Sequence, residues 1–217
     1  MVNGEQGAGI WDLSIDSEEA ANFALIAESG FFGQLLGLGE AEMGRIGNGF
    51  AEAAAKGDTE ALEHFADEGG NMQYLIEEVA ELAMVAMYHW VERILKRELG
   101  LKVPMATVKK MDYPKLASAF AAKGLDLNTL PDAQLVTGTL RYFANSWKHN
   151  AEAAGDPLLA DLGLKGDVFG HFSNEEIRQA LSPKLALTQT GTGVEIVKAL
   201  APRALDFLRG VVAVTRA

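Results

Sequence analysis

The sequence contains no cysteine and only four histidines, His64, His89, His149 and His171, among its 217 residues. Without cysteine the chain can form no disulfide, no thiolate zinc site and no cysteine nucleophile. The four histidines lie far apart in the sequence, so they do not form the spacing of a histidine-rich metal site. We therefore expect no bound metal ion and no other cofactor.

Basic residues and long apolar runs are also scarce. The chain has 19 Lys plus Arg against 30 Asp plus Glu, which gives a formal net charge of −11 at pH 7. Such a charge argues against nonspecific electrostatic binding to the phosphates of nucleic acid, but it does not exclude a local basic site. No apolar run approaches the roughly 20 residues of a membrane helix, and the first residues lack the basic and apolar regions of a signal peptide. We expect a cytoplasmic protein with no membrane partner.

Strand-like alternation of apolar and polar residues is almost absent, whereas alanine is abundant. Apolar residues recur instead at spacings of three and four, which is typical of helices packed on a core. The sequence therefore predicts an all-α bundle of about five or more helices with one long central helix. We expect a single helical domain over 1–217, in which 1–16 form a loose N-terminal tail.

The strongest helical pattern predicts one long helix over 71–99, with apolar residues along one face. Gly69 and Gly70 are expected to interrupt the chain just before it. Seven glycines within residues 30–49 predict repeated bends or breaks in that segment. The glutamates of the long helix, among them Glu77 and Glu81, are expected to face solvent.

The second half of the chain predicts shorter helices. Start and stop signals favour helices over 112–124, 132–154, 174–181 and 194–214. The stretch over 156–173 is expected to be a loop.

The helix over 132–154 has one apolar face and one polar face. Leu140, Phe143 and Trp147 fall on the apolar face, which we expect to pack against the long helix. The opposite side carries Arg141, Asn145, Lys148, His149 and Glu152, and the first four of these residues are called here the polar stripe. The stripe is either an ordinary solvated face or a binding site. Because the rest of the chain is acidic, we expect it to form the one positive patch of the surface.

A run of short motifs surrounds the polar stripe. It includes Asp112-Tyr113-x-Lys115-Leu116, Gly124-x-Asp126-Leu127, Leu140-Arg141 and Ala144-Asn145-x-x-Lys148-His149. Over 112–150 this run resembles HEPN-type proteins, all-helical modules whose signature is an Arg a few residues before a His, often with Asn directly after the Arg. Asn145 and His149 match the second half of the signature. Ala144 stands where the Arg would be, and Arg141 is the nearest upstream Arg.

The resemblance implies an RNA-directed function. Known HEPN-type proteins are commonly metal-independent ribonucleases in toxin or antiphage systems, and others are inactive binding or dimerisation modules. In the catalytic case His149 would transfer protons, Arg141 or Lys148 would stabilise the charged phosphorane, and Asn145 would position the phosphate. A homodimer would bring two polar stripes together.

Two hypotheses from different classes follow. In the first, the protein is a metal-independent ribonuclease or an RNA- or nucleotide-binding relative of one. In the second, it is a non-catalytic all-helical interaction or dimerisation module. The clustering of Arg141, Asn145, Lys148 and His149 favours the first hypothesis. The acidic net charge and Ala144 favour the second.

Overall fold

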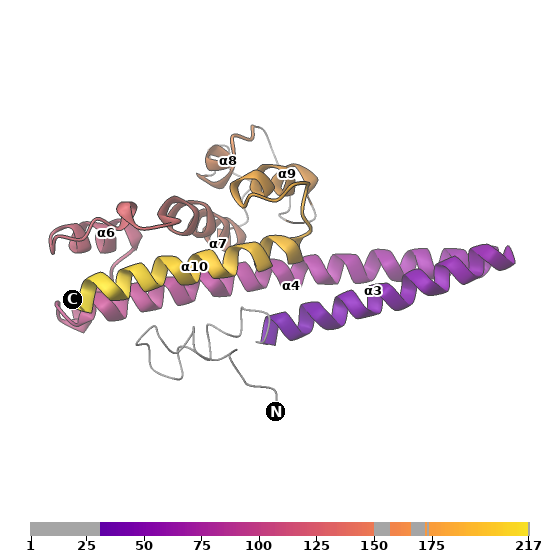
Figure 1. Ribbon diagram of the computed structural model, residues 1–217, viewed down its shortest axis with the longest axis horizontal. Helices are drawn as coiled ribbons and strands as arrows, with labels where there is room; N and C mark the ends of the chain where they lie inside the picture. The colour runs from indigo at the N-terminus through magenta and orange to yellow at the C-terminus, as the bar shows by residue number, and fades with distance from the viewer. Residues whose placement is uncertain (1–30, 150–156, 166–171, 173, 217) are drawn as a thin grey trace, which may run out of the picture.

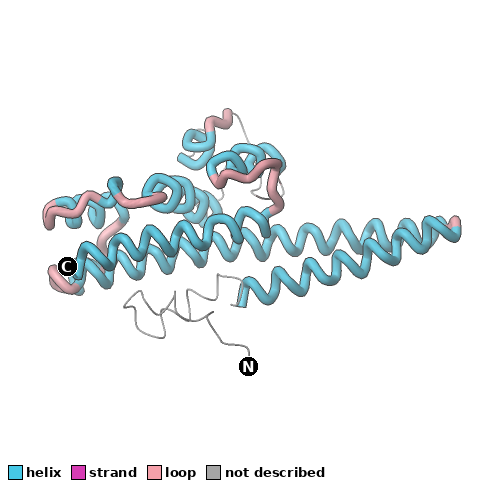
Figure 2. Tube along the Cα trace, viewed as in Figure 1, coloured by secondary structure: helices cyan, strands magenta, loops and turns pink. Residues whose placement is uncertain are grey.

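The computed structural model describes residues 31–149, 157–165, 172 and 174–216 (Figure 1). Every regular element in these residues is helical and none is a strand (Figure 2), which confirms the predicted all-α class. The elements in chain order are α3 (Phe31–Lys56), α4 (Thr59–Gly100), α5 (Met105–Val108), α6 (Tyr113–Ala121), the 3₁₀ helix η1 (Leu127–Thr129), the π-helix η2 (Gln134–Leu140), α7 (Arg141–His149), α8 (Pro157–Leu162), α9 (Glu175–Lys184) and α10 (Gly193–Arg216).

The long helix α4 organises the molecule. Its 42 residues correspond to about 63 Å of helix. It begins at Thr59, where the side chain of Asp58 accepts a hydrogen bond from Ala61 N at 3.1 Å. Helix α3 packs antiparallel against its first half, and the two form a hairpin that projects beyond the other helices (Figure 1). Helix α10 runs along its second half.

The predicted breaks at glycine do not occur. Helix α3 is continuous through its glycines, and Gly69 and Gly70 lie inside α4. Close packing of the two helices explains this at Gly39, where a Cβ would lie 2.6 Å from Cγ1 of Ile76. Packing at such contacts compensates for the low helix propensity of glycine, which sequence reasoning alone overweights.

The shorter elements follow the sequence with shifted ends. The predicted helices over 112–124, 174–181 and 194–214 correspond to α6, α9 and α10. The helix expected over 132–154 is divided into η2 and α7, and residues 150–154 lie outside the described part of the chain. The loop expected over 156–173 is wrong at its start. There α8 forms because Leu158 and Leu159 are buried.

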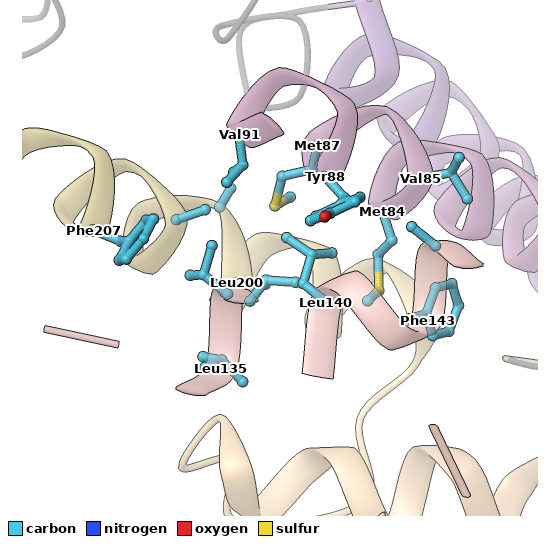
Figure 3. Packing of buried hydrophobic residues seen from close by; sticks show 14 of the residues in the cluster. Met84, Val85, Met87, Tyr88, Val91, Leu135, Leu140, Phe143, Leu200 and Phe207 are labelled. Atoms are coloured by element: carbon cyan, nitrogen blue, oxygen red, sulfur yellow. The ribbon is translucent and has the colours of Figure 1, made fainter. Parts of the chain in front are cut away.

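The core lies where η2, α7 and α10 meet the second half of α4. Met87 and Val91 of α4 are fully buried beside Leu140 of η2, Phe143 of α7 and Phe207 of α10 (Figure 3). The burial of Leu140 and Phe143 confirms the predicted apolar face. Trp147 is only half-buried and packs at the edge of the core.

Candidate functional site

The polar stripe lies on α7, next to the buried core. Arg141 is the first residue of this helix, and Asn145 follows one turn later; both are half-buried. Lys148 and His149 are the last two residues of α7, and their side chains lie outside the described part of the chain. The structure therefore places Arg141 and Asn145 together on one helix, as predicted.

Arg141 is held in place from three directions. Its Nε donates a hydrogen bond to the carbonyl oxygen of Thr137 at 2.6 Å. Its guanidinium lies over the ring of Tyr142 at 4.3 Å and over the ring of Tyr113 at 4.9 Å. Each such cation–π contact contributes about 0.5–2 kcal/mol, depending on exposure. The side chain is therefore a fixed cation rather than a mobile surface arginine.

The π-helix η2 sets the position of Arg141. Seven residues, Gln134–Leu140, form i→i+5 turns just before α7. Asp161 of α8 stabilises this segment, because it accepts hydrogen bonds from Thr139 Oγ1 at 2.7 Å and Gln134 Nε2 at 3.2 Å. Short π-helical segments occur frequently at functional sites. Sequence periodicity does not reveal them, since the apolar spacing changes by only one residue.

The inner side of α7 is tied to a buried carboxylate of α4. Trp147 Nε1 donates to Glu81 Oε2 at 3.2 Å, and the backbone N–H of Phe172 donates to Glu81 Oε1 at 2.7 Å. Glu81 is 4% exposed, so the expectation of a solvent-facing carboxylate is wrong there. Its hydrogen bonds to two separate segments explain why a charged group is retained in the core.

Glu77, one turn earlier on α4, is buried in the same way. Its carboxylate accepts hydrogen bonds from the backbone N–H of Gly193 at 2.9 Å and from Gln73 Nε2 at 2.7 Å. It therefore caps the start of α10. Burial raises the pKa of Glu77, and the hydrogen bond from Gly193 offsets only part of that effect. The expectation of a solvent-facing side chain is wrong here too.

Charge is strongly segregated along the chain. Residues 31–81 contain eleven acidic and two basic residues, whereas residues 93–123 contain eight basic and two acidic residues. The basic segment covers the end of α4, α5 and α6, outside the polar stripe. Basic residues therefore concentrate in this segment as well as in the polar stripe. Counting charged residues in successive windows of the sequence would have identified this basic segment.

In the described ranges, no three His, Asp or Glu residues are grouped so that they could hold a metal ion. None of the described helices is both long and apolar enough to cross a membrane.

Comparison with known proteins found no matching family model, no matching curated protein and no matching solved structure.

Proposed function

We propose that the protein is an RNA-directed, HEPN-like helical protein, a metal-independent ribonuclease or an RNA- or nucleotide-binding relative, acting in the cytoplasm in a toxin or defence setting. One observation carries the proposal: the guanidinium of Arg141 is fixed between Tyr113 and Tyr142 and is not paired with a carboxylate in the described part of the chain. A preorganised cation is what recognition of a phosphate, or of a charged phosphorane, requires.

The chemistry assigned to the polar stripe is general acid–base cleavage of RNA. His149 has an imidazole, whose ordinary pKa of about 6.5 suits proton transfer from the 2′-hydroxyl or to the leaving oxygen. Arg141 and Lys148 supply positive charge for the phosphorane. Asn145 supplies an amide donor on the same helix, one turn from Arg141.

The test is an RNA cleavage assay with purified protein in the presence of EDTA. We expect cleavage to persist with EDTA and to fall by about 10²–10⁴-fold in His149→Ala. The matched control is His64→Ala, because His64 is an exposed histidine on the α3–α4 hairpin. Full cleavage by His149→Ala would contradict the catalytic form of the proposal. RNA binding without cleavage would leave the binding form standing.

A second candidate function is supported by a different observation. Large apolar side chains are exposed along the α3–α4 hairpin, among them Leu38 at 68%, Tyr74 at 61% and Leu75 at 54%. A soluble monomer seldom leaves such residues together on one projecting element. They favour an interaction module that binds a partner along this hairpin.

A second copy of the chain fits this surface when the two α4 helices run antiparallel. The acidic segment 31–81 of one copy then lies against the basic segment 93–123 of the other, and the same contact forms twice. A parallel pair would place two acidic segments side by side. The homodimer would therefore gain both apolar burial and charge complementarity from one arrangement.

Sedimentation equilibrium tests this second candidate. We expect a dimer that Leu38→Gln or Leu75→Gln dissociates, because each change removes apolar area from the contact. Val214→Gln is the matched control, since Val214 is 46% exposed but lies on α10, outside both segments. A protein that remains monomeric at high concentration would contradict the dimerisation module.

A further inference from the structure

A hollow at the basic end of α4 has the composition of an anion site. It has a volume of about 410 Å³ and lies between the last turns of α4 and the short helix α5. The residues that line it are His89, Glu92, Arg93, Lys96, Arg97, Met105 and Lys109. Two arginines and two lysines therefore surround one space with a single carboxylate, in a chain whose net charge is −11.

Two of these cations are paired with carboxylates of α4. Glu92 is paired with Lys96 at 2.9 Å. Arg97 contacts the carboxylate of Glu98 at 2.7 Å, and Glu98 also binds Arg216. Arg93 stacks over Trp90 at 4.8 Å, and Lys109 makes no ion pair with any described residue. Lys109 is therefore a cation of this hollow that no described carboxylate neutralises.

The helix dipole does not explain this cluster. Cations are favoured in the last turn of a helix, and the effect fades beyond that turn. Arg97 lies in the last turn of α4, but Arg93 lies further back. Lys109 lies on the segment after α5 and still lines the same hollow. Two separate chain segments therefore converge on one space, as they do in a ligand site.

We propose that this cavity binds phosphate groups, either those of a free nucleotide or pyrophosphate or those of an RNA backbone. Arginine provides forked donors for phosphate oxygens and lysine provides a point charge. The volume falls in the range of cavities that hold small organic ligands, about 300–1,000 Å³. The site is separate from the polar stripe and does not depend on the function proposed for it.

The experiment uses the full chain and three probes: pyrophosphate and ADP in calorimetry, and a short single-stranded RNA in fluorescence anisotropy. Lys109→Gln should weaken binding about tenfold, because a charge-assisted contact is lost. Lys110→Gln is the matched control, since Lys110 is an exposed neighbour that does not line the cavity. Lys109→Arg should restore binding, and circular dichroism should show an unchanged fold.

Each outcome decides the matter. Binding of pyrophosphate or ADP with loss in Lys109→Gln alone identifies a free phosphate ligand, and the same pattern with RNA only identifies backbone phosphates. Equal losses of affinity in Lys109→Gln and Lys110→Gln would show that binding depends only on the general surface charge. That result would overturn the proposal. Failure of all three probes to bind would overturn it as well.

Discussion

Arg216 binds Glu98 through two hydrogen bonds, from Nε at 3.0 Å and from Nη2 at 2.8 Å, and so joins the last turn of α10 to the last turn of α4 across 118 residues of sequence. Glu98 is completely buried, and it also accepts hydrogen bonds from Arg97 and Thr215. Burial alone would raise the pKa of Glu98, but the hydrogen bonds from Arg216, Arg97 and Thr215 outweigh it and lower the pKa below 4.5.

Glu98→Gln should destabilise the fold by about 1.5–3 kcal/mol at pH 7, because hydrogen bonds to a charged carboxylate are lost. Glu77→Gln is the matched control. Glu77 is buried on the same helix, but the amide oxygen of glutamine can still accept from Gly193, and removing the charge relieves a burial cost. In Glu98→Gln, the free energy of unfolding measured by urea denaturation should be well below that of Glu77→Gln. An equal loss in both would contradict the role given to the charge of Glu98.

Glu98 and Glu77 should make opposite contributions to the pH dependence of stability. The pKa of Glu98 is lowered, so its contribution is present above pH 4.5 and is lost as the pH falls through its folded pKa. The pKa of Glu77 is raised, so its ionisation costs stability as the pH rises from 4.5 through its folded pKa. Stability measured from low pH to neutral should therefore rise less steeply in Glu98→Gln than in wild type. It should rise more steeply in Glu77→Gln.

Gly39→Ala should destabilise the α3–α4 hairpin by about 1–3 kcal/mol, because the new methyl would overlap Ile76. Ile76 is buried and β-branched, so it cannot easily move aside. Gly44→Ala is the matched control, since nothing lies within 4 Å of a Cβ at that position. It should stabilise the helix by about 0.5–1 kcal/mol. A melting temperature of Gly39→Ala above that of wild type would show that α3 and α4 lie further apart at this position than in the structure.

Trp147→Phe should cost about 1–3 kcal/mol, because it removes a hydrogen-bond donor to the buried carboxylate of Glu81. A double-mutant cycle with Glu81→Gln isolates the coupling between the two side chains. The loss in Trp147→Phe should shrink when Glu81 is already replaced. Additive losses would mean that the indole contributes only by packing.

The sequence predicts the helices better than it predicts the contacts between them. The N-cap at Asp112 and the helical spacing of Leu140 and Phe143 depend only on residues close by in the sequence. Both can therefore be predicted from the sequence alone. The continuity of α3 depends on Ile76, a residue of another helix. Such a contact cannot be inferred from local propensity.

The same contrast between local pattern and contacts with other helices applies to the polar stripe. Helical periodicity places Arg141 and Asn145 on one face of one helix, as observed. It does not reveal that Tyr113 and Tyr142 enclose the guanidinium, because Tyr113 belongs to α6. Nor does it show that Glu81 is buried, since the partners of its carboxylate come from α7 and from Phe172.

The most direct test of the central claim is the affinity of the protein for single-stranded RNA, measured by fluorescence anisotropy at several salt concentrations. The wild-type affinity should fall with salt by the small slope that a few phosphate contacts produce. Arg141→Gln and Lys148→Gln should each weaken binding about tenfold, whereas Lys56→Gln, an exposed change at the far end of α3, should leave it unchanged. Absence of RNA binding at low salt, or equal affinity in all three variants, would contradict the account.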